Sequence, residues 1–350
     1  MGSGAQAAAV VGFAAGAVCS RVLPKLLAHI RPDGPPPEAE ADEEPSERPP
    51  YRELALPTHG RYPYSAITER ADYAWPGGKR LAVYFAINLE HFAFGEGMGA
   101  KLGGFFGEPD VLNYSWRDYG NRVGVWRMLE LFDALSLPMA VLANASIYRY
   151  CPGVMAAFRE RKAEVVAHGR TNSEAQGALP EPEEAALIAD TTAELAAHED
   201  GTPPAGWLGP WISQSRTTPD LLAEAGYSYH LDWCHDDQPT WFECRDGRRI
   251  LSVPYQQEIN DIPHTIARQG GSAEFASDAI DAFEELLEQS TRGGPLVFGL
   301  ALHPYIVGQP HRLRQLRRAL EHIQRRADES GAVWFTQPGE VARHAATVLP

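Results

Sequence analysis

The feature that most limits the fold of this chain is a series of short apolar runs alternating with helical patterns. Residues 81–88 (LAVYFAIN) are apolar almost throughout, as expected of a strand buried on both faces. The runs EVVA and LVFGLAL have the same character, and helical patterns begin at Pro152 and Ser272. Alternation of this kind produces a parallel sheet, either open or closed.

Composition and motifs exclude several classes of function. The chain has 46 acidic and 31 basic residues and a net charge of −15, so its surface repels phosphate backbones and nucleic acid is not an expected partner. No GxGxxG follows the first strand, and GxxxxGK[ST] is absent from the sequence. Neither a dinucleotide loop nor a phosphate loop is therefore supported.

The first 59 residues differ in composition from the rest. Residues 1–34 contain an apolar run (5–19) whose basic flank follows it, whereas a secretory signal carries its positive charge in front. Fifteen residues also fall short of the roughly 20 that span a bilayer. A surface-packed helix or a targeting remnant is favoured, and an anchor in the membrane stays open. Residues 35–59 are rich in proline and glutamate and are predicted to be a solvated linker, so the catalytic domain should occupy 60–350.

The four cysteines favour a reducing compartment. Cys19, Cys151, Cys234 and Cys244 form no CxxC pair and no zinc-knuckle spacing. Free thiols are expected, and with them a cytoplasmic location. The alternative is the cytoplasmic face of a membrane, contacted through residues 5–19.

Polar residues follow three of the apolar runs. Glu90 and His91 come after the first, His168 after EVVA and His303 after LVFGLAL. The carboxyl ends of the strands of a parallel barrel face one mouth, so groups far apart in the sequence would meet there. Any one histidine could be a hydrogen-bonded structural residue, but three of them with a glutamate predict an active site.

The order of five segments resembles the polysaccharide deacetylase (NodB homology) superfamily, and is most similar to its allantoinase-like branch. The similarity extends over roughly residues 61–344 and implies a distorted (β/α) barrel of about seven parallel strands. It also implies a hydrolase of carbon–nitrogen bonds other than peptide bonds. The segments are GKRLAVYFAINLEHF, EVVAHGRTNSE, GWLGPWISQSRTTPDLLAEAGYSYHLDWCHDDQPTWF, SVPYQQEIND and VFGLALHPYIVGQPHRLRQLRRALEHI.

The resemblance implies roles for the residues at the strand ends. Glu90 matches the general base and His91 a metal ligand, while His168 matches the first of two histidine ligands. Asn172 stands where the second histidine is expected, and an amide is a poor zinc ligand. Two alternatives therefore remain open: no cofactor is required, or one divalent metal, zinc, is bound.

His303 matches the general acid that protonates the leaving group, and Asp232 is predicted to orient it. Amide hydrolysis needs one group to take the proton of water and another to protonate the departing nitrogen. A glutamate in a partly apolar pocket and an imidazole titrating near neutrality suit these tasks. Without a metal, the developing oxyanion would need a donor such as His91, His168, the Asn172 amide or a backbone N–H.

Further residues of the matched segments are predicted to bind substrate. Aromatic rings at a barrel mouth can stack on a flat ring or a sugar face, although such rings also pack in cores. The predicted substrate-binding residues are Trp207, Trp211, Arg170, Glu174, Glu258 and Asn260.

Three hypotheses follow. The first is hydrolysis of a small cyclic amide, ureide or imide, with a small molecule as the only expected ligand. The second is metal-dependent N-deacetylation of an acetylated sugar or polysaccharide. The third is a catalytically inactive barrel that binds a ligand or partner. The presence of both Glu90 and His303 argues against it, because a binding module has no need of an acid–base couple. The oligomeric state is left open, a homo-oligomer included.

Overall fold

The computed structural model describes residues 56–104 and 107–350. The predictions for residues 1–34, and for nearly all of the 35–59 linker, lie outside this part of the chain. Thr58–Pro350 forms one compact unit. Within the described ranges, no helix is both long and apolar enough to cross a membrane.

The described residues form a mixed sheet of nine strands, in which only the β6–β7 pair is antiparallel. The order is β6-β7-β5-β4-β3-β2-β1-β8, and β9 pairs with the first half of β1. This confirms the predicted α/β class, with eight parallel strands instead of about seven. The strands are β1 (Leu81–Leu89), β2 (Ala140–Ala143), β3 (Glu164–Ala167), β4 (Gly206–Trp207), β5 (Tyr229–His230), β6 (Thr240–Glu243), β7 (Arg249–Ser252), β8 (Leu296–Leu302) and β9 (Val333–Thr336).

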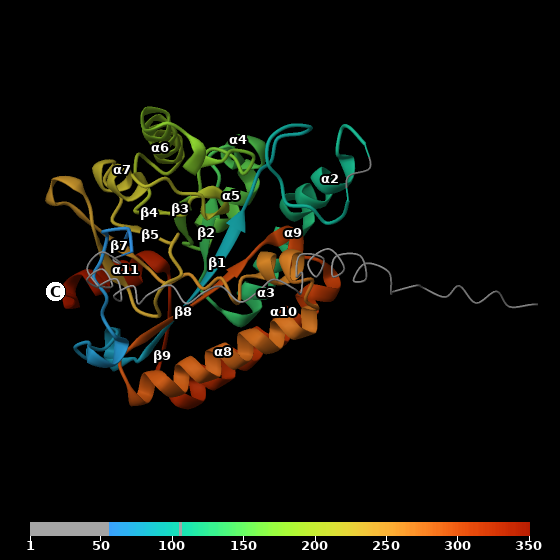
Figure 1. The fold of residues 1–350 in the computed structure, drawn as a ribbon. Coiled ribbons are helices and arrows are strands. Elements are labelled where there is room, and N and C mark those ends of the chain that lie inside the picture. The colour runs from blue at the N-terminus through green and yellow to red at the C-terminus, as the bar shows by residue number, and fades with distance from the viewer. Residues whose placement is uncertain (1–55, 105–106) are drawn as a thin grey trace, which may run out of the picture. The chain divides into compact units, whose positions relative to one another are not determined.

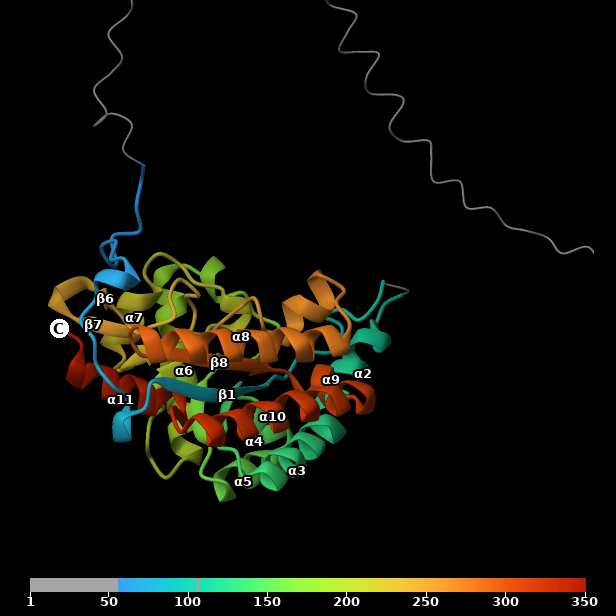
Figure 2. The same cartoon turned by 90° about the horizontal axis from the view of Figure 1, so that it is seen from below.

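Helices cover the outside of the sheet (Figure 1). Figure 2 shows α10 between α8 and α3; α10 contacts both helices, and α8 contacts β8 and β1. The α-helices are α2 (Val111–Tyr119), α3 (Val125–Leu135), α4 (Ile147–Tyr150), α5 (Pro152–Glu160), α6 (Glu181–His198), α7 (Thr218–Glu224), α8 (Ser272–Arg292), α9 (Pro304–Val307), α10 (Pro310–Ser330) and α11 (Pro338–Val348).

The edge of β8 that faces away from β1 forms hydrogen bonds with loop residues instead of with another strand. The side-chain amide of Gln256 accepts from Gly299 N at 2.8 Å and donates to Val297 O at 2.7 Å. Val297 N donates to the carbonyl oxygen of Asp237 at 2.9 Å. These bonds satisfy backbone groups that would otherwise be left unpaired in the interior.

Side chains of β1 alternate between two hydrophobic clusters. The odd-numbered residues from Leu81 to Leu89 pack with the helices, whereas Ala82, Tyr84 and Ala86 pack with residues of the neighbouring strands inside the barrel. A strand turns successive side chains to opposite faces, which explains the two sets. The next inward positions after Ala86 are residues 88 and 90.

The same alternation sets the last inward positions of β3 and β8. Val166 lies in the interior cluster, so the next inward residue is His168. Ala301 lies there too, so the next is His303. Three polar side chains are thereby directed to one end of the barrel by strand periodicity alone.

Candidate active site

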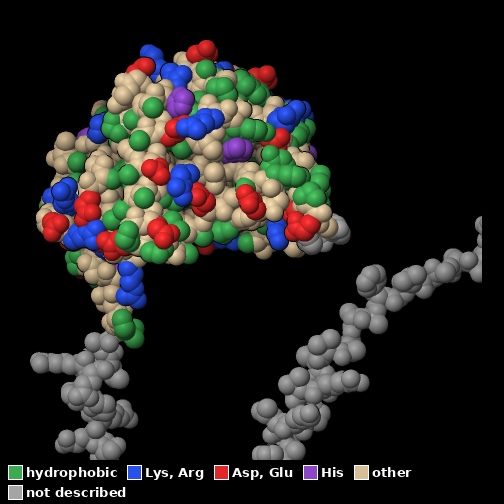
Figure 3. Space-filling view, turned by 90° about the horizontal axis from the view of Figure 1, so that it is seen from above, with side chains coloured by type: hydrophobic (Ala, Val, Ile, Leu, Met, Phe, Trp, Pro, Cys, Tyr) green, Lys and Arg blue, Asp and Glu red, His purple; other side chains and the backbone are tan. Residues whose placement is uncertain are grey.

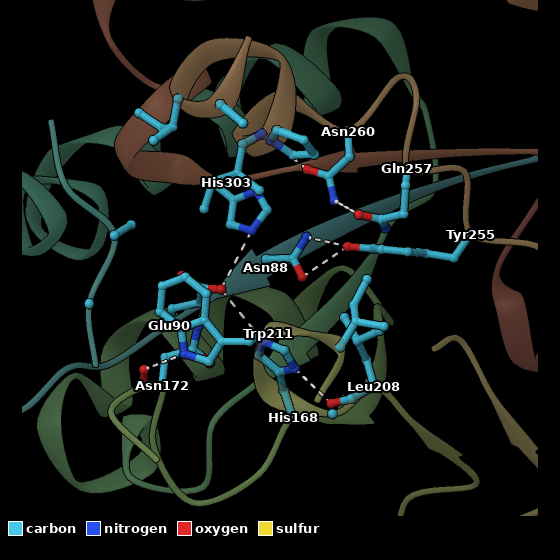
Figure 4. Close-up of a pocket in the computed structure, with 18 of the residues that line it drawn as sticks. Asn88, Glu90, His168, Asn172, Leu208, Trp211, Tyr255, Gln257, Asn260 and His303 are labelled. Carbon is cyan, nitrogen blue, oxygen red and sulfur yellow. Dashed lines mark hydrogen bonds and ion pairs between the residues drawn. The ribbon is translucent and has the colours of Figure 1, made fainter. Parts of the chain in front are cut away.

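A pocket of about 350 Å³ lies at the carboxyl ends of these strands and contains Glu90, His168 and His303 (Figure 4). The sequence prediction that these three side chains converge is confirmed. Figure 3 views the molecule from the side toward which β1 points in Figure 1, where acidic and basic side chains are intermixed. Much of the pocket wall is apolar, with side chains from Ala100, Leu208, Trp211, Ile212, Ile262, Pro263, Ile266 and Ala267.

The two oxygens of the Glu90 carboxylate have different surroundings. Oε2 accepts a hydrogen bond of 2.8 Å from the hydroxyl of Tyr305. Oε1 lies 3.5 Å from Nε2 of His168 and 3.5 Å from Nε2 of His303. These two separations exceed the usual hydrogen-bond length, so Oε1 is the oxygen placed to accept a proton from a bound water.

His303 is held by a buried carboxylate that the sequence prediction missed. Asp261 accepts from the backbone N of His303 at 2.7 Å, and its other oxygen lies 2.6 Å from Nδ1. Asp261 is fully buried. Because the carboxylate accepts from Nδ1–H, Nε2 is the ring atom that faces the pocket.

The prediction that Asp232 orients His303 is wrong. Asp232 accepts hydrogen bonds from Gly209 N and Gln214 Nε2, both at 2.7 Å. It follows the short strand β5 and is buried, and neither of these bonds involves His303. Burial raises the pKa of Asp232 to about 7, and His303 is not among the groups that shift this pKa.

The charges of the acid–base pair reinforce one another. Burial alone would raise the pKa of Glu90, but the positive charge of His303, whose Nε2 lies 3.5 Å from Oε1, is the main influence that lowers it to about 2. Burial would lower the pKa of His303, but the charges of Asp261 and Glu90 raise it to about 10. The resting state is therefore a carboxylate beside an imidazolium. The expectation that His303 titrates near neutrality is not met.

These charges predict the pH dependence of turnover. Catalysis by an ionised Glu90 and a protonated His303 should be lost as pH rises through about 10 and stay level across neutrality. Asp261→Asn removes the carboxylate that raises the pKa of His303, so the alkaline limb of kcat/KM should move down by about 1 to 3 pH units. The pH profiles of both proteins measure this shift, and an unmoved limb would show that Asp261 does not set the charge of His303.

His168 has a fixed orientation. Its Nδ1 lies 2.7 Å from the carbonyl oxygen of Leu208, which can only accept, so Nδ1 carries the proton. Within the described residues, Nε2 makes no hydrogen bond and faces Glu90 Oε1. In a ring that is protonated at Nδ1 alone, Nε2 is an acceptor.

The residues expected to bind zinc do not fit a metal site. The side chain of His91 points outward, where Nδ1 lies 2.9 Å from Ser146 Oγ and the ring stacks on Tyr150 at 4.2 Å. Oδ1 of Asn172 accepts from Asn144 at 3.2 Å. Across residues 56–104 and 107–350 no three His, Cys, Asp or Glu side chains are grouped to hold an ion. The assignment of His91 as a ligand is thus wrong, since it is odd-numbered and Glu90 takes the inward position.

A substitution at residue 91 tests this conclusion. His91→Gln keeps a polar side chain beside Ser146 and should leave kcat/KM within about threefold of the wild-type value, because residue 91 does not contact the pocket. Steady-state kinetics with and without a chelator measure the effect. A much larger loss that added zinc reverses would restore His91 as a ligand.

Two of the predicted substrate-binding residues line the pocket. Asn260 is buried at its edge. Trp211 donates from Nε1 to the carbonyl oxygen of Asn172 at 2.9 Å, and both Trp211 and Ile212 have positive φ (63° and 53°). Consecutive residues rarely adopt this region, and such strain concentrates at functional sites.

The other four predicted substrate-binding residues do not line this pocket. Trp207 is fully buried against Tyr227, because it is the outward residue of β4. Arg170 and Glu174 form an ion pair with each other at 2.8 Å outside the pocket. Glu258 is exposed and pairs with Arg268.

Known proteins share this fold and about a quarter of the aligned residues, although no family model matches the chain. A Schizosaccharomyces pombe protein named as a polysaccharide deacetylase is 26% identical over 297 residues, covering 77% of this chain and 91% of the relative. A Helicobacter pylori peptidoglycan deacetylase is 23% identical over 289 residues, covering 74% of this chain and 94% of the relative.

Solved structures give the same result. The PuuE allantoinase superposes with a TM-score of 0.72 and 27% identity, over 83% of this chain and 99% of that one. A Pseudomonas aeruginosa protein named as a polysaccharide deacetylase superposes with a TM-score of 0.70, also at 27% identity and the same coverage. These similarities confirm the resemblance found in the sequence: the chain is related to the polysaccharide deacetylases, and its fold is also that of an allantoinase.

Proposed function

We propose that this protein hydrolyses a carbon–nitrogen bond in a small cyclic amide, ureide or imide. The observation that carries the proposal is the pairing of a buried carboxylate with a buried imidazolium across one pocket, Glu90 and His303. The relatives support the same class of chemistry, because a deacetylase and an allantoinase both add water across a C–N bond.

The proposed reaction uses both members of the pair. Glu90 Oε1 takes a proton from water as the oxygen attacks the scissile carbonyl, giving a tetrahedral intermediate. The C–N bond then breaks while His303 Nε2–H protonates the departing nitrogen. Glu90 is left protonated and His303 neutral, and proton transfer between Oε1 and Nε2, 3.5 Å apart, restores the resting state.

The size and lining of the pocket favour a small substrate. About 350 Å³ accommodates a molecule with a single ring, and pockets for small ligands have mainly apolar walls with few polar groups, as here. At one side Asn88 and Tyr255 bond each other at 2.9 Å and present their polar ends to the pocket. Such groups can fix the orientation of a ring that carries amide groups.

The relatives' names favour a second candidate, deacetylation of an N-acetylated sugar. The same base and acid would serve, because an acetamide also needs attack by water and protonation of nitrogen. The two candidates differ in the group that leaves: ring opening produces one product, whereas deacetylation releases acetate.

A hydrolysis screen of the full chain tests both candidates. Allantoin, hydantoin, dihydrouracil and N-acetylglucosamine oligomers are incubated with the protein, with and without a chelator and with added zinc. Ring-opened product without acetate would support the proposal, and acetate release would favour the second candidate. No turnover on any substrate would overturn both and leave an inactive binding barrel.

A further inference from the structure

Asn172 lines the pocket, is 2% exposed, and stands where the sequence resemblance places a second histidine. The proposed reaction gives Asn172 no role, because Glu90 is its base and His303 is its acid. What Asn172 offers to a ligand depends on which end of its side-chain amide faces the pocket, and the surrounding hydrogen bonds determine this.

The orientation follows from Asn144, which is fully buried at the end of β2. The backbone N–H of His91 can only donate, so the atom of Asn144 that lies 2.8 Å from it is Oδ1. Nδ2 of Asn144 therefore faces the carbonyl oxygen of His168, which can only accept, and lies 3.2 Å from the side chain of Asn172. A donor faces an acceptor, so Oδ1 is the end of Asn172 turned toward Asn144.

The backbone of Asn172 is also occupied. Its N–H donates to His91 O at 2.8 Å, and its carbonyl oxygen accepts from Trp211 Nε1 at 2.9 Å. Nδ2 is then the one polar group of Asn172 that bonds to nothing among the described residues, and it is not sealed in the interior. In the view of Figure 4, Asn172 lies on the side of the pocket of Glu90 and His168, across from Asn260.

We propose that Nδ2 of Asn172 donates a hydrogen bond to the carbonyl oxygen of the substrate as that oxygen becomes an oxyanion. This inference rests on the proposed function. The other two side chains considered for this task are unsuitable: His91 points to Ser146, and the Nδ1–H of His168 is bonded to the carbonyl oxygen of Leu208. The fixed N–H dipole of Asn172 would thus stabilise the negative charge on the oxyanion, as a cation does at a metal site.

Asn144 acts in this scheme as a positioning residue. Its one amide bonds His91, His168 and Asn172, and thereby ties together the segments that follow β1 and β3. A donor held in place before the reaction begins does not reorganise as charge develops, which is the condition for a large effect.

The test compares Asn172→Asp and Asn172→Ala with the wild type in the full chain. Asp keeps the shape and the acceptor toward Asn144 but replaces the pocket-facing donor, whereas Ala removes it without adding charge. Both should lower kcat about 100-fold or more and change KM less. Gln315→Glu on the outside of α10 makes the same amide-to-carboxylate change away from the pocket and should have no effect. An Ala variant with near wild-type kcat would overturn the proposal.

A binding measurement tests the inference independently of turnover. N-Carbamoylglycine, the carboxylate formed when hydantoin opens, carries an anionic oxygen where the oxyanion would form. By calorimetry it should bind the wild type at least about tenfold more tightly than either variant. Equal affinities, or no binding by any of the three proteins, would overturn the role of Asn172. The proposed function itself is tested by the hydrolysis screen, in which the wild type would show no turnover if that function were wrong.

Discussion

Glu90→Gln is expected to lower kcat about 10³- to 10⁴-fold while KM changes little. Gln has nearly the same shape, but it cannot accept a proton from water. Its side-chain oxygen can still accept from Tyr305, which bonds Oε2 of Glu90 at 2.8 Å, so the local structure should persist. Steady-state kinetics on the substrate identified by the screen measure the loss.

Two controls distinguish loss of the base from loss of structure. Glu174→Gln makes the same change at a residue outside the pocket, and should leave kcat unchanged. Thermal unfolding of both variants should show folded proteins. The Glu90 variant should also keep a neutral-pH affinity for an uncharged substrate analogue. An active Glu90→Gln enzyme would remove this residue as the base and the proposed mechanism with it.

The parts of the site that could be predicted from sequence are those that follow long strands. The apolar runs of β1 and β8 fix both the end of each strand and the direction of its side chains, so Glu90 and His303 were recognisable as pocket residues. If the same alternation is continued beyond the strand, Glu90 points into the barrel and His91 points away from it. The resemblance aligned the two residues as a pair, and strand geometry turns the second one away.

Residues after short strands could not be placed in this way. β4 and β5 have two residues each, too few for any alternation to show in the sequence. Trp207, which points outward, was therefore predicted to bind substrate, and Asp232, which bonds Gly209 and Gln214, was predicted to orient His303. Asp261 was missed because it lies outside the strands, at the start of a short helical turn 42 residues before His303. Asn260 and Asp261 are adjacent in a matched segment, and only the folded structure shows that Asp261 is the one that bonds His303.

His303→Asn should lower kcat about 10²- to 10⁴-fold, because no other group protonates the departing nitrogen. The size of the loss should depend on the substrate. An imide nitrogen leaves more easily without protonation than an amide nitrogen, so the loss should be smaller for imides than for simple amides. A direct comparison of kcat ratios on the two substrate classes measures this difference.

The buried partner of His303 complicates the substitution and also allows it to be controlled. Removing the imidazolium leaves Asp261 as an uncompensated buried carboxylate, and breaking such a pair costs about 3 to 5 kcal/mol of stability. The double variant Asp261→Asn/His303→Asn removes that charge as well, so it should recover much of the stability and none of the activity. If instead the double variant regained turnover, or if the loss in the single variant were equal for imides and amides, His303 would be a structural residue. The acid of the reaction would then have to be sought among the other groups of the pocket.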